Sequence, residues 1–330
     1  MQSQAIHIEL RDDEVQKLPR HPLHVFKPAR ARACGKLIVV GEHAVVYGAH
    51  ALAVPLHSMQ LNIVLDTPDT GDFRRPHKSI HSEKLQLVLR DALALLKIEP
   101  LPLKIEGHSN ILFGAGLGAS AALSVSILRA LSHFFHLEIE AHELALLANQ
   151  LEKRFHGNPS GLDTTTVALE KPILFRRNAV PRFLQISPIT LDGKNYPWSF
   201  AIIDSDTRSP TLPMVQQSAP YFTGHGAYDR LYEFDQTALL ACQGMESGEL
   251  GSVQAAMRKA GSMLTDVGVV PPLLQTMMAT AEDCGALAAK VTGAGGGGCV
   301  LCLLHPADAE NSLRKLREQF GSNKVYSLCL

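Results

Sequence analysis

The sequence predicts an α+β protein made of two lobes, and three features of the chain lead to this fold class. Short apolar runs of strand length alternate with helical patterns in the first half. Three long helical patterns precede the last strands in the second half. Between the halves, residues 190–198 combine Asp, Gly, Asn and Pro, which is typical of turns. We therefore place the boundary between the lobes within these residues.

The elements of the first half follow from periodicity and turn chemistry. Strands are short apolar runs, and they are expected at residues 36–40, 60–65 and 101–106. Leu85, Leu89, Leu93 and Leu96 recur at the spacing of a helix, which is expected at residues 80–97. Further helices are expected at residues 121–134 and 144–155. Residues 66–79 carry Pro, Gly and mixed charges, which indicates a loop.

The second half is mostly helical after Tyr221. Its helices are expected at residues 226–247, 249–265, 271–285 and 306–320. Its strands are expected at residues 199–204, 288–291, 299–304 and 324–328. Cys299 and Cys302 form a C-x-x-C pattern, but side chains three apart on a strand point to opposite faces. We therefore interpret these two thiols as core side chains rather than as a redox or zinc pair.

Composition excludes several classes of function. The chain has 330 residues, of which 46% are hydrophobic and 19% charged, as is typical of a globular protein. Its formal net charge of −1 lacks the basic excess of a nucleic-acid-binding protein. No secretory signal is visible, and no apolar run reaches the ~18 residues of a membrane span. Six cysteines without framework spacing indicate free thiols. We expect a cytoplasmic protein with no nucleic-acid or membrane partner.

A glycine-rich segment at residues 113–122 carries the strongest local signal for chemistry. Gly114, Gly116 and Gly118 let the backbone approach a ligand closely, and an apolar helical pattern follows at once. A glycine loop at a helix N-terminus offers unpaired N–H groups and the positive end of the helix dipole, which together bind phosphate. A tight turn between a strand and a helix, without a ligand, is the simpler alternative.

Residue spacing leaves the kind of phosphate ligand open. Gly114, Gly116 and Ala119 satisfy the dinucleotide fingerprint G-x-G-x-x-A, and Glu138 lies near the acidic position of that motif. An NAD(P)-dependent oxidoreductase is therefore one candidate. A Walker A loop is excluded, because G-x-x-x-x-G-K-[ST] does not occur in the chain.

A second glycine cluster and several ionic side chains add to this signal. Residues 293–298 contain five glycines, and a close approach to a ligand would explain the entropy lost when they are ordered. Lys36 lies beside an apolar strand, so its charge needs a partner or must reach solvent. Glu152 lies near a helix end, and the turn at 158–161 presents Asp163 at the start of the next element. Taken alone, each of these groups is also compatible with a capping or surface role.

In their order along the chain, three segments resemble the motifs of the GHMP kinases. These segments are Gly35–Gly48, which contains Gly-Glu-His-Ala-Val-Val-Tyr-Gly, then Gly114–Ala122, then Lys290–Cys299. The first segment and His156-Gly-Asn-Pro-Ser-Gly-Leu-Asp163 are similar to the branch that phosphorylates mevalonate. The resemblance runs from Ala33 to Leu304 and implies a two-lobed fold with the active site between the lobes. The expected divisions are an N-terminal extension over 1–32, an S5-domain-2-like ATP-binding domain over 33–195, and a ferredoxin-like domain over 196–330.

The resemblance implies that ATP and Mg²⁺ are used to convert (R)-mevalonate to 5-phosphomevalonate in isoprenoid precursor biosynthesis. It assigns Asp163 as the base that accepts the proton of the substrate hydroxyl, with Lys36 nearby. Ser120 and Glu152 would hold Mg²⁺. The residues expected to contact mevalonate are Glu42, His43 and Thr211. The residues expected to bind ATP are Gly114, Ala115, Gly116, Leu117, Gly118, Ala119, Ser120, Gly295 and Gly296.

Three positions depart from the family pattern. Cys34 stands where Pro is usual, Ala119 where Ser is usual, and Thr164 where Asn is usual. Because of Ala119 and Thr164, a GHMP kinase with another acceptor, such as phosphomevalonate, remains an alternative. The resemblance also leads us to expect a homodimer.

Overall fold

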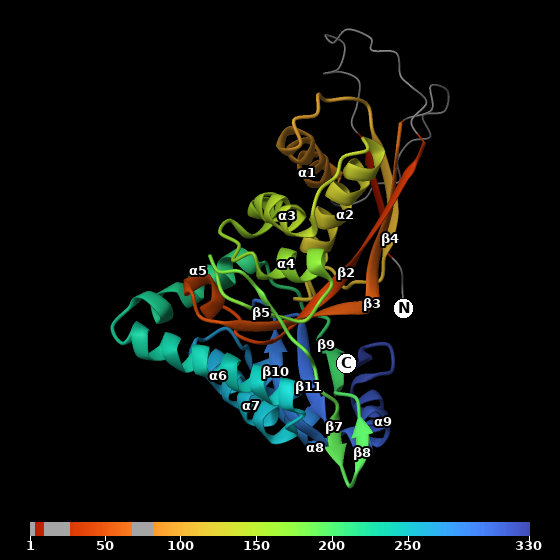
Figure 1. The fold of residues 1–330 in the computed structure, drawn as a ribbon. Helices are drawn as coiled ribbons and strands as arrows, with labels where there is room; N and C mark the ends of the chain where they lie inside the picture. Colours follow the sequence, from red (N-terminus) through yellow and green to blue (C-terminus); the bar gives the residue numbers. More distant parts are fainter. Residues whose placement is uncertain (1–3, 10–26, 68–81) are drawn as a thin grey trace.

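The computed structural model describes residues 4–9, 27–67 and 82–330. Two lobes lie one above the other, and a long pair of strands reaches from the upper lobe to the junction (Figure 1). The loop predicted at residues 66–79 falls outside the described residues beyond Thr67. Of the expected extension at 1–32, residues 4–9 form a strand that belongs to the upper sheet.

A six-stranded antiparallel sheet forms one side of the N-terminal lobe. Its strands are β1 (Gln4–Glu9), β2 (Ala29–Val40), β3 (Ala51–Asp66), β4 (Lys104–Ser109), β5 (Ile173–Phe175) and β6 (Arg182–Phe183). The strand order is β1-β4-β3-β5-β6, and β2 also pairs with β3. β2 begins with alternating buried Ala and exposed Arg and then becomes buried on both faces. This change marks where the strand leaves the solvated part of the sheet and enters the junction of the lobes.

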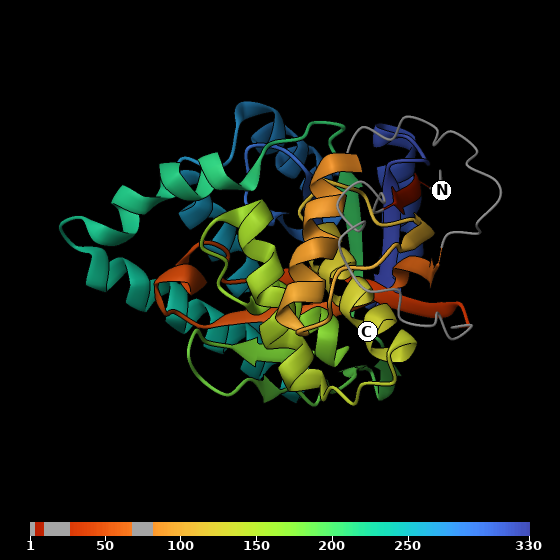
Figure 2. The same cartoon turned by 90° about the horizontal axis from the view of Figure 1, so that it is seen from above.

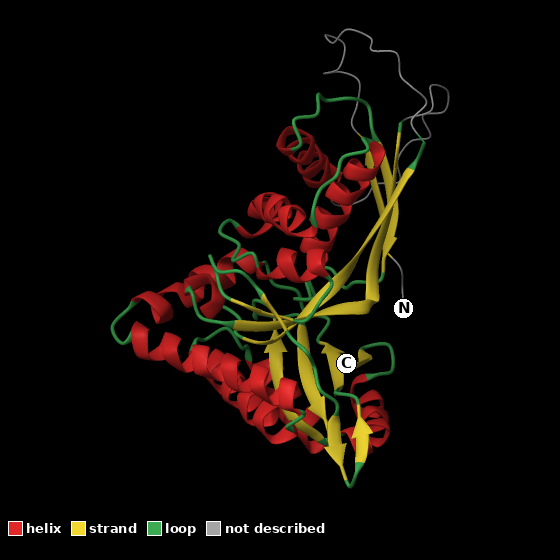
Figure 3. Ribbon diagram, viewed as in Figure 1, coloured by secondary structure: helices red, strands yellow, loops and turns green. Residues whose placement is uncertain are grey.

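Four helices cover one face of this sheet (Figures 1 and 3). They are α1 (Ser82–Leu95), α2 (Ala119–Phe134), α3 (Ala141–His156) and α4 (Leu162–Leu169). α2 packs on β2 and β3, and its small and aliphatic side chains are almost all buried. The segment before α2 meets the C-terminal lobe, where Gly116 lies against Thr292 and Gly293.

The C-terminal lobe is an antiparallel sheet flanked by helices. Its strands have the order β10-β11-β9-β12 and span Ala286–Thr292, Cys299–Leu304, Ser199–Asp204 and Val325–Cys329. A hairpin of β7 (Ile189–Leu191) and β8 (Lys194–Tyr196) precedes β9. The helices are α5 (Thr211–Thr223), α6 (Ala227–Ser247), α7 (Leu250–Asp266), α8 (Pro272–Asp283) and α9 (Ala309–Phe320). The ends of α5 and α6 that adjoin each other project to one side of the molecule (Figures 1 and 2).

The α+β class and the longer predicted elements are confirmed, mostly with small shifts of their ends. The exceptions are β2 and β3, which begin seven and nine residues before the strands predicted at 36–40 and 60–65. The pattern of apolar residues does not predict α4, α5 or the short strands β1 and β5 to β8. α4 is short and rich in Thr, and α5 contains Pro213 and Pro220, so neither has the sequence of a helix that forms on its own. The division at residues 195 and 196 stays a prediction, and the β7–β8 hairpin ends at that point.

The interpretation of the C-x-x-C pattern is confirmed. Cys299 and Cys302 lie on β11 and are fully buried, each in a different apolar cluster, so their side chains occupy opposite faces of the strand. Both are free thiols, and burial raises their pKa. Within residues 4–9, 27–67 and 82–330, the helices lack the combination of length and apolar character that crossing a bilayer requires.

Candidate active site

A cavity of about 750 Å³ opens where the two lobes meet. Its wall contains residues of β2, the first turn of α2, the C-terminal half of α3, the starts of α4 and α5, and the loop between β10 and β11. The predicted site residues in this wall are Lys36, Glu42, His43, Gly114, Gly116, Leu117, Gly118, Ala119, Ser120, Glu152, Asp163, Thr211 and Gly295. Ala115 and Gly296 are not part of the lining, because Ala115 is buried against Gly298 and Gly296 faces Met214.

The glycine loop, residues Gly114–Gly118, leads into the N-terminus of α2. Gly114, Gly116 and Gly118 have φ angles of +69°, +82° and +78°, in the left-handed region that favours glycine. Gly118 is the N-cap residue and has no side chain that could cap the helix. The first N–H groups of α2 can therefore bind an anion in the cavity.

The loop approaches the other lobe most closely at Gly116, which makes this position a test of the loop. An added Cβ would lie 2.4 Å from the carbonyl oxygen of Thr292. We expect Gly116→Ala to raise the KM for ATP at least about tenfold, because the loop must shift and the φ angle is strained. Steady-state kinetics at saturating acceptor would measure this change.

Gly251→Ala is the matched control for this variant. Gly251 lies in α7, and an added Cβ would meet nothing within 4 Å. This substitution should leave the KM for ATP unchanged and raise helix stability by up to about 1 kcal/mol. An unchanged KM for ATP in Gly116→Ala would show that ATP binding does not depend on the shape of the loop.

Lys36 and Asp163 form an ion pair at the floor of the site. Lys36 lies in the buried part of β2, and Asp163 lies in the first turn of α4. Lys36 Nζ is 3.0 Å from Asp163 Oδ2 and donates to the Gly116 carbonyl at 3.2 Å. The Lys36 side chain is 2% exposed and that of Asp163 26%, so the carboxylate is the more accessible partner. A carboxylate placed this way can accept a proton from a bound hydroxyl, with a cation beside the developing charge.

Ser120 of α2 and Glu152 of α3 converge on the same part of the cavity. Ser120 Oγ donates to Glu152 Oε2 at 3.3 Å, and His156 Nδ1 lies 2.7 Å from the same oxygen. Glu152 is 1% exposed, and its Oε1 has no hydrogen-bond partner among the described residues. Burial lowers the pKa of His156, but the hydrogen bond that His156 donates to Glu152 and the charges of Glu152 and Asp163 outweigh burial, so this pKa is raised.

The Ser120–Glu152 pair has the chemistry of a magnesium site. Mg²⁺ prefers oxygen ligands and typically takes one or two from the protein, with phosphate oxygens and waters completing its shell. A hydroxyl and a carboxylate with an unpartnered buried oxygen meet this requirement. In the described part of the chain, no group of three or more His, Cys, Asp or Glu could hold a metal ion. The donor set thus suits an ion shared with phosphates rather than an all-protein metal centre.

Glu42 of the N-terminal lobe pairs with Lys290 of β10. Lys290 Nζ donates to Glu42 Oε1 and, at 2.6 Å, to the carbonyl of Val291. The side chains of Glu42 and Lys290 are 1% and 0% exposed. Burial raises the pKa of Glu42 and lowers that of Lys290, and the attraction between the two groups opposes both shifts. Glu42 lines the cavity, and its Oε2 has no partner within the described residues.

His43 is held at both ring nitrogens. Nε2 lies 3.0 Å from the carbonyl oxygen of Ala294, and Nδ1 lies 3.0 Å from Ser218 Oγ. A carbonyl oxygen only accepts, so Nε2 carries the proton. Burial lowers the pKa of His43 to about 4, which keeps the ring neutral near pH 7. His43 thus lines the cavity, but its nitrogens are occupied by bonds to α5 and to the loop between β10 and β11.

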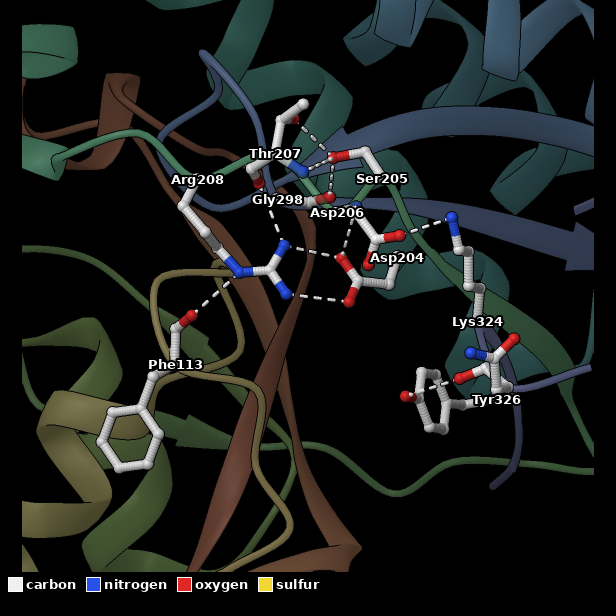
Figure 4. A network of polar contacts seen from close by, with 10 residues as sticks. Phe113, Asp204, Ser205, Asp206, Thr207, Arg208, Gly298, Lys324 and Tyr326 are labelled. Carbon is white, nitrogen blue, oxygen red and sulfur yellow. Dashed lines mark hydrogen bonds and ion pairs between the residues drawn. The ribbon is translucent and has the colours of Figure 1, made fainter. Parts of the chain in front are cut away.

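Arg208 connects the glycine loop to the C-terminal sheet. Its Nη1 and Nη2 donate to the two carboxylate oxygens of Asp204 at 2.7 and 2.8 Å, and its Nε donates to the Phe113 carbonyl at 3.0 Å. Figure 4 shows the guanidinium group between these two partners. Asp204 ends β9, and Phe113 precedes the glycine loop. Because a bidentate pair fixes the guanidinium plane, Arg208 holds the two lobes in register beside the cavity.

The second glycine loop, residues Gly293–Gly298, is anchored in the C-terminal lobe. The Gly298 N–H donates to the Thr207 carbonyl at 2.9 Å, and Ser205 Oγ donates to the Gly298 carbonyl at 2.6 Å (Figure 4). Gly293, Gly295 and Gly297 of this loop line the cavity. The two glycine loops therefore face the same space from opposite lobes.

Sequence reasoning missed three residues at the site. His156 follows Glu152 by four positions, which is the spacing at which side chains on a helix meet. This spacing could have predicted the contact between His156 and Glu152 from the sequence. Lys290 interrupts an apolar strand, which indicates a buried charge with a partner. Nothing in the sequence marks Arg208, because its partners Asp204 and Phe113 come together only in the folded chain.

The dinucleotide interpretation of Gly114, Gly116 and Ala119 is wrong. That fingerprint requires a parallel strand–helix–strand unit. All strand pairings within the described residues are antiparallel. The glycine loop is therefore a phosphate-binding element of another fold.

Comparisons with known proteins agree with this geometry. The sequence matches the families described as GHMP kinases N terminal domain over residues 85–171 and GHMP kinases C terminal over residues 241–322. It is 30% identical over 309 residues to the mevalonate kinase of Aeropyrum pernix, a match that covers 88% of this chain and 93% of that relative.

Solved structures show the same fold. The mevalonate kinase of L. major in complex with R-mevalonate superposes with a TM-score of 0.75 and 22% identity, covering 94% of this chain and 97% of that one. Streptococcus pneumoniae phosphomevalonate kinase in complex with phosphomevalonate and AMPPNP gives a TM-score of 0.72 and 19% identity, covering 91% and 99%. The fold alone does not separate these two kinds of kinase, whereas the sequence match over most of the chain is to a mevalonate kinase. The chain belongs to the mevalonate kinase family of the GHMP kinases.

Proposed function

We propose that this chain transfers the γ-phosphoryl group of ATP to the primary hydroxyl of mevalonate, giving 5-phosphomevalonate. The observation that carries this proposal is the Lys36–Asp163 pair, which lies beside the glycine loop at the N-terminus of α2 in one cavity. Membership of the mevalonate kinase family supports the choice of acceptor.

In this proposal, Asp163 accepts the proton of the acceptor hydroxyl as the oxygen attacks the γ-phosphorus. Lys36 stabilises the negative charge on that oxygen, and its hydrogen bond to the Gly116 carbonyl keeps it beside the glycine loop. The N–H groups at the start of α2 bind the phosphates of ATP. Phosphoryl transfer depends on positioning and charge neutralisation, which these groups supply.

Ser120 and Glu152 would hold Mg²⁺ in the same cavity. When bound there, Mg²⁺ would supply charge neutralisation for the phosphates of ATP. His156 donates to Glu152 and fixes the orientation of its carboxylate, as an outer partner of a metal ligand does. This arrangement leaves Glu152 Oε1 without a partner among the described residues, so this oxygen would be available as a metal ligand.

Glu42, His43 and Thr211 are proposed to form the acceptor side of the cavity. Thr211 begins α5, and all three residues belong to the lining. Because both nitrogens of His43 have protein partners, we assign it to shaping this wall. The homodimer expected from the resemblance and the cytoplasmic location expected from the composition stay predictions.

An acceptor panel tests the proposed function. ADP release would be followed in a coupled assay with Mg·ATP and mevalonate, phosphomevalonate, homoserine or galactose. Turnover with mevalonate alone is expected. Turnover with phosphomevalonate instead would keep the site and replace the acceptor, and this outcome would point to Ala119 and Thr164, where the chain departs from the family pattern.

Removing the carboxylate of Glu152 tests the metal assignment. We expect Glu152→Gln to raise the Mg²⁺ concentration needed for half-maximal activity at least about tenfold, because even the outer partners of metal ligands contribute about 10–100-fold to metal affinity or activity. The measurement is a Mg²⁺ titration at fixed ATP. Glu143→Gln in the first turn of the same helix is exposed and serves as the control. An unchanged titration in Glu152→Gln would remove Glu152 from the metal site.

A further inference from the structure

The buried pair Glu42–Lys290 has a geometry that the transfer step does not explain. Lys290 is fully buried on β10 and does not line the cavity, whereas Glu42 does. The Lys290 ammonium donates one hydrogen bond to Glu42 Oε1 and another to the Val291 carbonyl, and it donates none to Glu42 Oε2. Glu42 Oε2 is buried without a partner among the described residues. Leaving a buried carboxylate oxygen unpaired is costly unless a ligand satisfies it.

The pair also joins the two lobes at the cavity. Glu42 follows β2 of the N-terminal lobe, while Lys290 comes from β10 of the C-terminal sheet. Beside them, Thr292 Oγ1 donates to the Ile38 carbonyl at 3.3 Å, so β10 is also bonded to β2 at this point. The opposite lobe thus fixes the position of Glu42. A fixed position suits a side chain that must point at a bound molecule with little conformational freedom.

We propose that Lys290 is a positioning residue for the acceptor, because it holds Glu42 Oε1 and thereby leaves Oε2 to accept a hydrogen bond from a second hydroxyl of the acceptor. This inference rests on the proposed function. The hydroxyl that is phosphorylated belongs beside Asp163, so the one that Glu42 binds is another. Mevalonate carries such a group, the tertiary hydroxyl on C3. The Glu42–Lys290 pair then selects acceptors with two hydroxyl groups over acceptors with one.

The first test compares two acceptors that differ by this hydroxyl. 5-Hydroxy-3-methylpentanoate keeps the carboxylate and the primary hydroxyl of mevalonate and lacks the tertiary one. In the unaltered protein, kcat/KM should fall at least about a hundredfold with this analogue, because a site built to bind a hydroxyl rejects a substrate without it. In the double variant Glu42→Leu/Lys290→Met, the two acceptors should differ by less than about threefold, since the pair is replaced by apolar groups of similar volume.

The second test isolates Lys290 through a pH profile. The charged groups acting on Glu42 are Lys290 and, with smaller influence, Lys36, and neutral His43 is its neighbour in the chain. In Lys290→Met, the loss of the nearby cation raises the pKa of Glu42 further, because Lys290 is the largest influence that opposes the effect of burial. Below that pKa Oε1 or Oε2 carries a proton. The KM for mevalonate should therefore rise at least about tenfold at pH 7 and fall again as the pH is raised and Glu42 ionises, with the KM for ATP unchanged.

Lys324→Met is the matched control. Lys324 forms a half-exposed ion pair with Asp206 outside the cavity, so its replacement should change neither the acceptor preference nor the pH profile.

If Lys290→Met does not fold, the double variant carries the test alone. Retained discrimination between the two acceptors in the double variant, or an unchanged mevalonate KM in a folded Lys290→Met, would overturn the inference while leaving the proposed function intact. Absence of mevalonate turnover in the unaltered protein would instead refute the proposed function.

Discussion

Replacing Asp163 by Asn is expected to lower kcat at least about a hundredfold while the KM for ATP changes little. Asn keeps the size of the side chain and can still accept a hydrogen bond from Lys36, so the contact at 3.0 Å is retained in a neutral form. An amide cannot take up the proton of the acceptor hydroxyl, and the loss falls on the chemical step. Steady-state kinetics with mevalonate and Mg·ATP measure both constants.

Asp192→Asn provides the control for this experiment. Asp192 lies in the turn between β7 and β8, is exposed, and has a φ angle of +49°, which Asn tolerates well. Both kinetic constants should stay the same in this variant. Turnover near the normal rate in Asp163→Asn would show that another group accepts the proton.

Replacing Lys36 by Met is expected to lower kcat and kcat/KM together by at least about a hundredfold, the size of effect seen when one preorganised donor is removed from a site of developing charge. Met has a similar length and suits the buried environment of β2, where Lys36 is 1% exposed. The ammonium next to Asp163 and the link to the Gly116 carbonyl are lost. Rates in single turnover separate this effect from product release.

Two comparisons make the Lys36 result specific. Lys194→Met changes an exposed lysine of β8 and should leave the rate unchanged. The double variant of Lys36→Met and Asp163→Asn should lose little more activity than either single variant, because residues that act as a unit are not additive. Losses that multiply in the double variant would show that the two residues act independently.

The sequence predicts the elements that carry chemistry better than it predicts the contacts between lobes. The glycine loop and the helix that follows it are recognisable because positive φ angles and apolar periodicity leave direct marks on the sequence. The Lys36–Asp163 contact could not be read in this way. It depends on β2 and α4 lying side by side, and α4 itself has no helical signature.

The buried charges show where pattern analysis stops. Lys290 and Glu42 are separated by 248 positions, and each has the appearance of an isolated polar residue next to apolar ones. His43 was expected to contact the acceptor, yet the fold uses both of its nitrogens to bind Ser218 and Ala294. Hydrogen-bond partners distant in sequence decide these roles, because a buried polar group must be satisfied wherever the folded chain places it.

In the proposed function, a phosphoryl group moves from ATP to the primary hydroxyl of mevalonate in the cavity between the lobes. Phosphorus NMR of the products formed from Mg·ATP and mevalonate tests it directly. We expect ADP and a new phosphomonoester whose phosphorus couples to the two protons of the C5 methylene. Release of inorganic phosphate without a phosphate ester, or an ester at another carbon, would contradict it.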